Sequence, residues 1–197
     1  MDAMLNDRST PATLLATRRS GKPRDLGLPG PDAATLDAML SIAARTPDHG
    51  KLAPWRFVVV DDRDRFARVL ADAWRAEKPA ASAADLANVE QFARQAPTLV
   101  VVLSSPKEGA IPRFEQEMSA GAATMNLLHA AAAHGFAGGW LTGWAAQSPA
   151  VLAAFGAAPE RIAGFVFIGT PQRALDERPR PDLDRIVSRW GLDAQPA

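Results

Sequence analysis

The apolar positions of the chain follow two patterns, which predict strands and helices in alternation. Continuous runs of mainly β-branched residues at 56–60, 98–103 and 162–168 predict three buried strands. Apolar residues spaced three and four apart predict helices over about 11–17, 64–74, 85–94 and 112–134, and a further helix that Asp32 caps and that stops before Pro47. The first helix would follow a cap at Thr10 and bury Leu14 and Leu15, and Gly135 would end the longest helix. Helices that flank and interleave a few strands are typical of a layered α/β or α+β domain.

The longest helical pattern, from about Pro112 to His134, predicts a contact with a second subunit. Met118, Ala122, Met125, His129 and Ala132 fall on one stripe, and small residues make up most of the remainder. At roughly 1.5 Å per residue such a helix spans a whole small domain. It must therefore be covered on most sides, either by its own fold or by another copy of the chain.

The length of 197 residues predicts a single domain over 1–197, and about 172–197 reads as an extended, charged C-terminal arm. No apolar run approaches the roughly 18 residues that a membrane span needs. The polar segment Met1–Thr10 lacks the apolar stretch of a signal peptide. We therefore expect no membrane partner.

The composition excludes several classes of function. With 22 basic and 22 acidic side chains the formal net charge is zero, which argues against nucleic acid or an anionic membrane as a partner. The absence of cysteine removes disulfides and thiolate chemistry and fits a reducing, cytoplasmic location. Histidines 129 and 134 lie five apart on a helix, so no metal site is expected, and no GxSxG, P-loop or GxGxxG motif is present.

Three segments remain as candidates for ligand binding. The basic turn from Arg18 to Arg24 offers guanidinium groups and a hydroxyl that suit a phosphate, or it is only a solvated turn. The loop with Arg45 and His49 is fixed by two prolines, or it is an ordinary connection. The glycine-flanked piece 138–143 lets the backbone approach a flat ligand, or it is a tight turn. Together they suit a phosphorylated planar cofactor that supplies the chemistry, with no catalytic side chain expected.

In the same order and at similar spacing, these and two further segments resemble the flavin-dependent nitroreductase family, most closely its compact YdjA-like bacterial subgroup. The resemblance runs from about Leu14 to Pro171. The matching segments are Arg18-Arg19-Ser20, Arg45-Thr46-Pro47-Asp48-His49 with Pro54-Trp55, PRFEQEMSAG at 112–121, GFAGGW at 135–140 and GFVFIGTPQ at 164–172. The implied fold is α+β with three layers: a central mixed or antiparallel sheet flanked by helices, with a domain-swapped C-terminal arm.

The resemblance also implies FMN as the cofactor, a homodimer with FMN at the subunit interface, and NAD(P)H as co-substrate. The implied cofactor-binding residues are Arg18, Arg19, Ser20, Lys22, Arg45, His49, Trp140, Leu141, Thr142 and Arg180. Arg18, Ser20 and the late Arg180 would hold the phosphate end, and Arg45 and His49 would reach the flavin of the other subunit. Either Lys22 or Arg24 would meet the pyrimidine edge, and the helix end 130–135 would meet the nicotinamide.

The implied reaction is a ping-pong transfer of hydride from NAD(P)H through the flavin to a small-molecule acceptor such as a nitroarene or quinone. Two other interpretations stay open. One is an FMN-binding redox sensor or flavin reservoir without turnover. The other is special flavin chemistry on the same fold, such as flavin destruction or dehalogenation.

Overall fold

A computed structural model describes residues 4–191 of the chain. Its centre is a five-stranded sheet in the order β1-β5-β3-β2, with β4 paired to β5, and every pairing is antiparallel. The strands are β1 (Leu26–Gly27), β2 (Trp55–Val59), β3 (Thr98–Ser104), β4 (Ala137–Leu141) and β5 (Arg161–Pro171). The three strands predicted from β-branched runs are confirmed as β2, β3 and β5, and the glycine-flanked piece forms most of β4.

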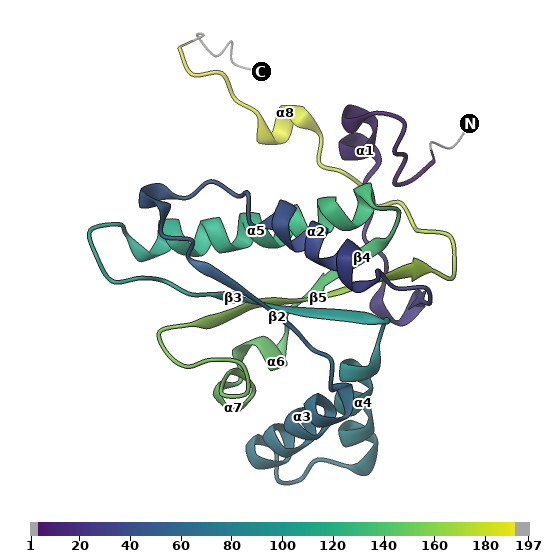
Figure 1. Ribbon diagram of the computed structural model, residues 1–197, viewed down its shortest axis with the longest axis vertical. Helices are drawn as coiled ribbons and strands as arrows, with labels where there is room; N and C mark the ends of the chain where they lie inside the picture. The colour runs from purple at the N-terminus through teal and green to yellow at the C-terminus, as the bar shows by residue number, and fades with distance from the viewer. Residues whose placement is uncertain (1–3, 192–197) are drawn as a thin grey trace.

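Helices cover both faces of the sheet, which gives the predicted three layers (Figure 1). One face carries α2 (Ala33–Ala43) and α5 (Arg113–Ala133), with α1 (Pro11–Thr17) beyond them. The other face carries α3 (Arg63–Glu77), α4 (Ala83–Arg94), α6 (Trp144–Gln147) and α7 (Pro149–Leu152). The α+β class expected from the sequence is therefore confirmed.

The alternation of side chains along the central strands explains why both faces are apolar. Leu99, Val101, Leu103 and Phe165 pack in the cluster under α3 and α4, whereas their neighbours in sequence pack in the cluster under α2 and α5. Successive side chains of a strand point to opposite faces, so a continuous apolar run fills two cores at once.

Local capping chemistry sets several helix ends where the sequence predicts them. Thr10 caps α1 just before Pro11, because its hydroxyl accepts a hydrogen bond from the backbone N–H of Thr13. The Asp32 carboxylate caps α2 in the same way by accepting from the N–H of Thr35. Helix α5 ends at Ala133 with His134 as its C-cap, and Gly135 follows with a φ of +89° that favours glycine.

Part of α5 is exposed on the surface of the protein. Phe114 and Met118 are 62% and 69% exposed, while Leu127 and Leu128, two turns further on, are buried in the core. The described residues contain no helix that is long and apolar enough to cross a membrane.

The C-terminal arm leaves β5 and runs past α1 on the α5 side of the sheet, with one short helix, α8 (Leu183–Ile186) (Figure 1). Every residue from 176 to 191 is exposed, as the arm prediction requires, and residues 192–197 of the predicted arm lie outside the described residues. Leu15 was expected to be buried with Leu14, and this expectation is wrong. The side chain of Leu15 is 61% exposed because the two-turn helix α1 turns only Leu14 toward the protein.

Candidate functional site

The basic turn begins where α1 ends, because Arg18 leaves the helical conformation as the C-cap residue. Its guanidinium donates to the Ser20 hydroxyl at 3.3 Å and forms no ion pair with any described residue. Burial lowers the pKa of Arg18 below its usual range, and the nearby cations of Arg19 and Arg180 lower it further. The turn is therefore a concentration of positive charge that an anionic group would relieve.

Arg19 lies deeper, with only 7% of its surface exposed. Its Nε donates to the Asp176 carbonyl at 2.9 Å and lies 3.2 Å from Glu177 Oε1, so the side chain holds the C-terminal arm. Its backbone N–H donates to Asn6 Oδ1 at 2.6 Å, and the Asn6 N–H donates to the Thr17 carbonyl. Asn6 thus fixes the turn from the N-terminal side, which no sequence motif indicated.

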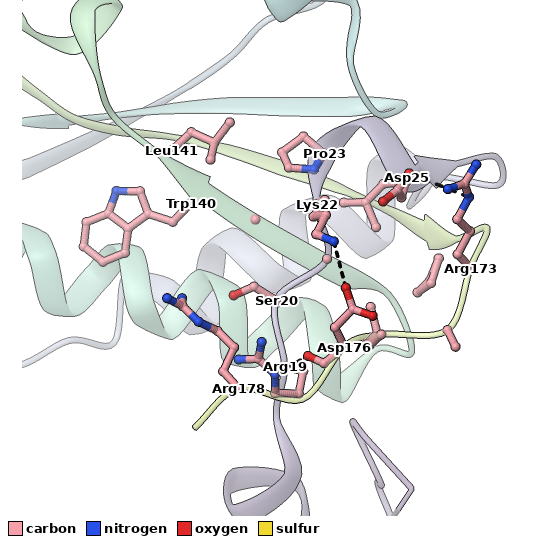
Figure 2. A pocket seen from close by; sticks show the side chains of 16 residues that line it. Arg19, Ser20, Lys22, Pro23, Asp25, Trp140, Leu141, Arg173, Asp176 and Arg178 are labelled. Atoms are coloured by element: carbon pink, nitrogen blue, oxygen red, sulfur yellow. Dashed lines mark hydrogen bonds and ion pairs between the residues drawn. The ribbon is translucent and has the colours of Figure 1, made fainter. Parts of the chain in front are cut away.

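A cavity of about 420 Å³ opens beside this turn (Figure 2). It is lined by residues of three segments that are distant in sequence: 19–26, 139–141 and 171–178. Lys22 points across it to the arm, with Nζ 2.7 Å from Asp176 Oδ2. Of the two residues considered for the pyrimidine edge, Lys22 lines this cavity, and Arg24 is not among the lining residues.

The glycines of β4 pack against the chain itself. A Cβ on Gly139 would lie 2.6 Å from the Gly21 carbonyl oxygen, and one on Gly138 would lie 2.6 Å from Leu128 Cδ2. The Gly21 N–H donates to the Gly138 carbonyl at 3.1 Å. Gly138 is buried and does not line the cavity, so a flat ligand in the cavity would not reach the backbone at this glycine. The glycines instead let the basic turn lie directly on β4.

Trp140 and Leu141 follow the glycines and form the apolar wall of the cavity. The indole Nε1 donates to the Ala163 carbonyl at 3.0 Å, and Gly164 leaves the space that the ring occupies, since a Cβ there would lie 2.0 Å from Nε1. The indole is 36% exposed, so part of it remains available to a ligand. Thr142 is exposed and lies outside the cavity lining.

The arm contributes a cation that the sequence interpretation missed. Arg178 lines the cavity, and Figure 2 shows its side chain beside Ser20 on the side of Trp140. Arg180 is not a lining residue; its Nη2 lies 3.4 Å from Glu177 Oε1, and its charge still reaches Arg18. The only available sequence signal for Arg178 was its position two residues before Arg180.

The two residues of the Pro-fixed loop lie apart from this cavity. Arg45 is exposed just beyond α2 and lines neither the cavity nor the shallow depression at His49. His49 Nδ1 lies 2.8 Å from Glu115 Oε2 of α5, at a shallow depression of about 340 Å³ that also includes Met118. Asp48 shapes the loop because its carboxylate accepts from the backbone N–H groups of Leu52 and Ala53.

The helix end expected to meet a nicotinamide is mostly inaccessible. Ala130, Ala131 and Ala132 are at most 3% exposed, which leaves 133–135 to face solvent. His129, which directly precedes Ala130, has a buried Nδ1 without a hydrogen-bond partner. Burial lowers the pKa of His129, and the charge of Arg18 lowers it further. Across residues 4–191 no three histidine or carboxylate side chains are grouped to hold a metal ion.

Comparison with known proteins places these features in a family. The pattern that defines the Nitroreductase family matches residues 15–170. A protein of Escherichia coli with the provisional name NAD(P)H nitroreductase YdjA is 39% identical over 163 residues, covering 81% of this chain and 87% of that protein. A protein of Haemophilus influenzae, also provisionally named an NAD(P)H nitroreductase, is 36% identical over 168 residues, covering 80% and 86%.

Solved structures share the fold. A nitroreductase-like family protein from Bacillus cereus aligns with a TM-score of 0.75 at 19% identity, covering 93% of this chain and 97% of that one. A nitroreductase from Desulfovibrio desulfuricans, solved in complex with FMN, aligns with a TM-score of 0.71 at 21% identity, covering 92% and 97%. At these identities the likeness concerns the fold alone. Together with the match over 15–170, it shows that the chain belongs to the nitroreductase family of oxidoreductases and, by its identity to YdjA, to the YdjA-like subgroup.

Proposed function

We propose that the protein is an FMN-dependent oxidoreductase that uses NAD(P)H to reduce nitroaromatics, quinones or similar small acceptors. The observation that carries this proposal is the positive charge of Arg19 and Arg180 near Arg18, which donates to the Ser20 hydroxyl, beside a cavity that Trp140 lines. A cluster of cations at one end and a flat apolar surface at the other match the phosphate and the ring system of FMN. The Desulfovibrio structure in complex with FMN supports this cofactor, and the name of the YdjA relative supports NAD(P)H as the co-substrate.

Each side chain would have a separate task in holding FMN. Arg18 and the Ser20 hydroxyl would donate to the phosphate, with Arg178 and Arg180 adding charge from the arm. Trp140 and Leu141 would pack against the ring system and exclude water from it. Lys22 would place its ammonium at the pyrimidine edge, where it stabilises negative charge. Bound FMN would supply the redox chemistry, accepting hydride from NAD(P)H and passing electrons to the acceptor.

We further propose that the active form is a homodimer with FMN at the subunit interface. The exposed Phe114 and Met118 of α5 leave an apolar surface that a second copy would cover. Arg45 and His49 lie outside the cavity of their own subunit, so they would reach a flavin only in a partner's cavity. The C-terminal arm, which lies on the same side of the sheet as α5, would cross to the other subunit beyond the cavity.

The test of the cofactor assignment compares FMN with riboflavin, which lacks the phosphate. We expect the purified chain to bind FMN more tightly than riboflavin, as measured by quenching of flavin fluorescence. Arg18→Ala should weaken FMN binding about tenfold or more while leaving riboflavin binding unchanged, because a charge-assisted bond to the phosphate contributes about 1.5–3 kcal/mol. Arg68→Ala, on α3 across the sheet, is the matched control and should alter neither affinity. An Arg18→Ala variant with wild-type affinity for FMN would refute the phosphate assignment.

The redox role is tested on the FMN-loaded protein. NADH or NADPH added without oxygen should bleach the flavin absorbance, and a nitroaromatic or quinone should restore it. Stable FMN binding without NAD(P)H oxidation would favour a redox sensor or flavin reservoir instead. Mass spectrometry of the flavin after reduction in air distinguishes flavin-destroying chemistry from a reductase and from a sensor or reservoir, both of which leave the flavin intact.

A further inference from the structure

The main chain and the side chain of Asp176 make two independent contacts with the basic turn (Figure 2). Its backbone carbonyl accepts from Arg19 Nε at 2.9 Å, and its Oδ2 lies 2.7 Å from Lys22 Nζ. The Arg19–Glu177 ion pair adds a third link between turn and arm. The arm is therefore anchored by contacts that do not require the Asp176 carboxylate.

The carboxylate does determine the charge that Lys22 presents to the cavity. Among the described residues, Asp176 is the one acid within ion-pair distance of Lys22. The other acid that lines the cavity, Asp25, lies 4.0 Å from Arg173. Lys22 lowers the pKa of Asp176 by a hydrogen bond and then by its charge, with a smaller contribution from Arg19, which favours the carboxylate form of Asp176.

We propose that Asp176 is a positioning residue that lowers the reduction potential of the bound flavin by sharing the charge of Lys22. This inference rests on the proposed function, in which Lys22 faces the pyrimidine edge of FMN. A cation at that edge favours the reduced flavin, which carries the added negative charge. A carboxylate in direct contact with the ammonium opposes its field at the ring and holds Nζ toward the arm, so the pair favours the reduced form less than free Lys22 would.

The test measures the dissociation constants of oxidised and reduced FMN, without oxygen, for the wild type and for Asp176→Asn, which removes the charge and keeps the backbone contact to Arg19. The ratio of the oxidised to the reduced constant should rise about tenfold in Asp176→Asn, equivalent to about 30 mV for a two-electron couple. Glu177→Gln is the matched control. It removes the neighbouring acid, which contacts Arg19 and Arg180 but not Lys22, and should leave the ratio within about threefold of the wild type.

A double variant distinguishes charge sharing from a structural role. Lys22→Met should lower the ratio, and Asp176→Asn should then have no further effect, because Asp176 acts only through Lys22. A merely structural carboxylate would instead weaken both forms of FMN equally and leave the ratio unchanged. An unchanged ratio in Asp176→Asn, with FMN bound, overturns the inference and leaves the proposed function intact.

A flavin-free readout tests the ion pair itself. Lys22→Met should raise the pKa of the Asp176 carboxyl, followed by NMR, toward its ordinary range, with only the smaller effect of Arg19 remaining. A pKa that stays low in Lys22→Met would refute the pairing, whether or not FMN binds. Failure of the wild-type chain to bind FMN would overturn the proposed function and, with it, the effect on the flavin.

Discussion

Glu160 connects three segments at the end of the sheet opposite the cavity, and its replacement by glutamine should destabilise the fold in a pH-dependent way. Its Oε1 accepts from Arg56 Nε at 2.7 Å and from the Ser105 hydroxyl, and its Oε2 accepts from Arg56 Nη2 at 2.9 Å. The bidentate contact with Arg56 on β2 and the Ser105 hydrogen bond lower the pKa of Glu160 to about 2. The loop before β5 is thereby fastened to β2 and to the end of β3.

The size of the effect follows from the shifted pKa and from the exposure of the partners. Lowering a carboxyl pKa from 4.5 to about 2 corresponds to an upper bound of about 3 kcal/mol of unfolding free energy at neutral pH. The Glu160 side chain is 18% exposed but that of Arg56 is 45% exposed, so solvent screens much of the pair. We expect Glu160→Gln to lose about 1–2 kcal/mol.

The sign of the pH dependence follows because the pKa of Glu160 is lower in the folded protein than in the unfolded chain. The stabilisation is complete above about pH 4.5, where the unfolded chain is also ionised, and disappears as the pH falls toward 2. Urea unfolding of the two proteins should show a constant difference from pH 7 to 6 that shrinks between pH 4.5 and 3. Glu90→Gln, which removes an exposed pair with Arg94 one turn away on α4, should change stability by at most about 0.5 kcal/mol. A Glu160→Gln difference that is absent at pH 7, or unchanged at pH 3, would refute this reasoning.

Three further substitutions test the packing of the turn, its N-terminal support and the proposed dimer. Gly139→Ala should cost about 1–3 kcal/mol in chemical unfolding and weaken FMN binding, because the new Cβ would meet the Gly21 carbonyl oxygen at 2.6 Å; an unchanged unfolding midpoint would contradict this packing. Asn6→Ala should lower the free energy of unfolding by about 1 kcal/mol and weaken FMN binding, because the turn at Arg19 loses a hydrogen-bond acceptor. Asn6→Asp keeps the acceptor and should lose less stability; equal losses in the two variants would argue against the hydrogen bond. Met118→Asp should shift the light-scattering mass from that of a dimer to near 21 kDa, and a dimer that persists would remove α5 from the interface.

Local sequence rules predicted much of the fold. The caps at Thr10 and Asp32 and the glycine that ends α5 depend on neighbours within a few residues. Strand β1 was missed because Leu26 and Gly27 form only two residues of a ladder with Thr170 and Pro171, too few to leave a periodic pattern. The exposure of Leu15 was missed because a two-turn helix does not reveal which of two adjacent leucines faces the protein.

The candidate site was predictable in its parts but not in its assembly. The composition of the basic turn suits a phosphate, and the family resemblance implies that Arg18 and Ser20 hold it; this assignment stays a prediction. The contact of Asp176 with that turn, and the position of Arg178 in the same cavity, join segments about 150 residues apart, and no spacing rule connects such positions. The glycines of β4 were assigned to a ligand because the sequence does not reveal that Gly21 and Pro23 fill the space beside Gly139.

The cavity has a consequence for the order of folding events. Residues 19–26 and 171–178 both line it, so segments about 150 residues apart in the sequence must meet before the cavity exists. Synthesis proceeds from the N-terminus, so the basic turn is made long before strand β5 and the segment that follows it can close the cavity. Capture of the proposed FMN would therefore be a late step of folding, after β5 has joined the sheet.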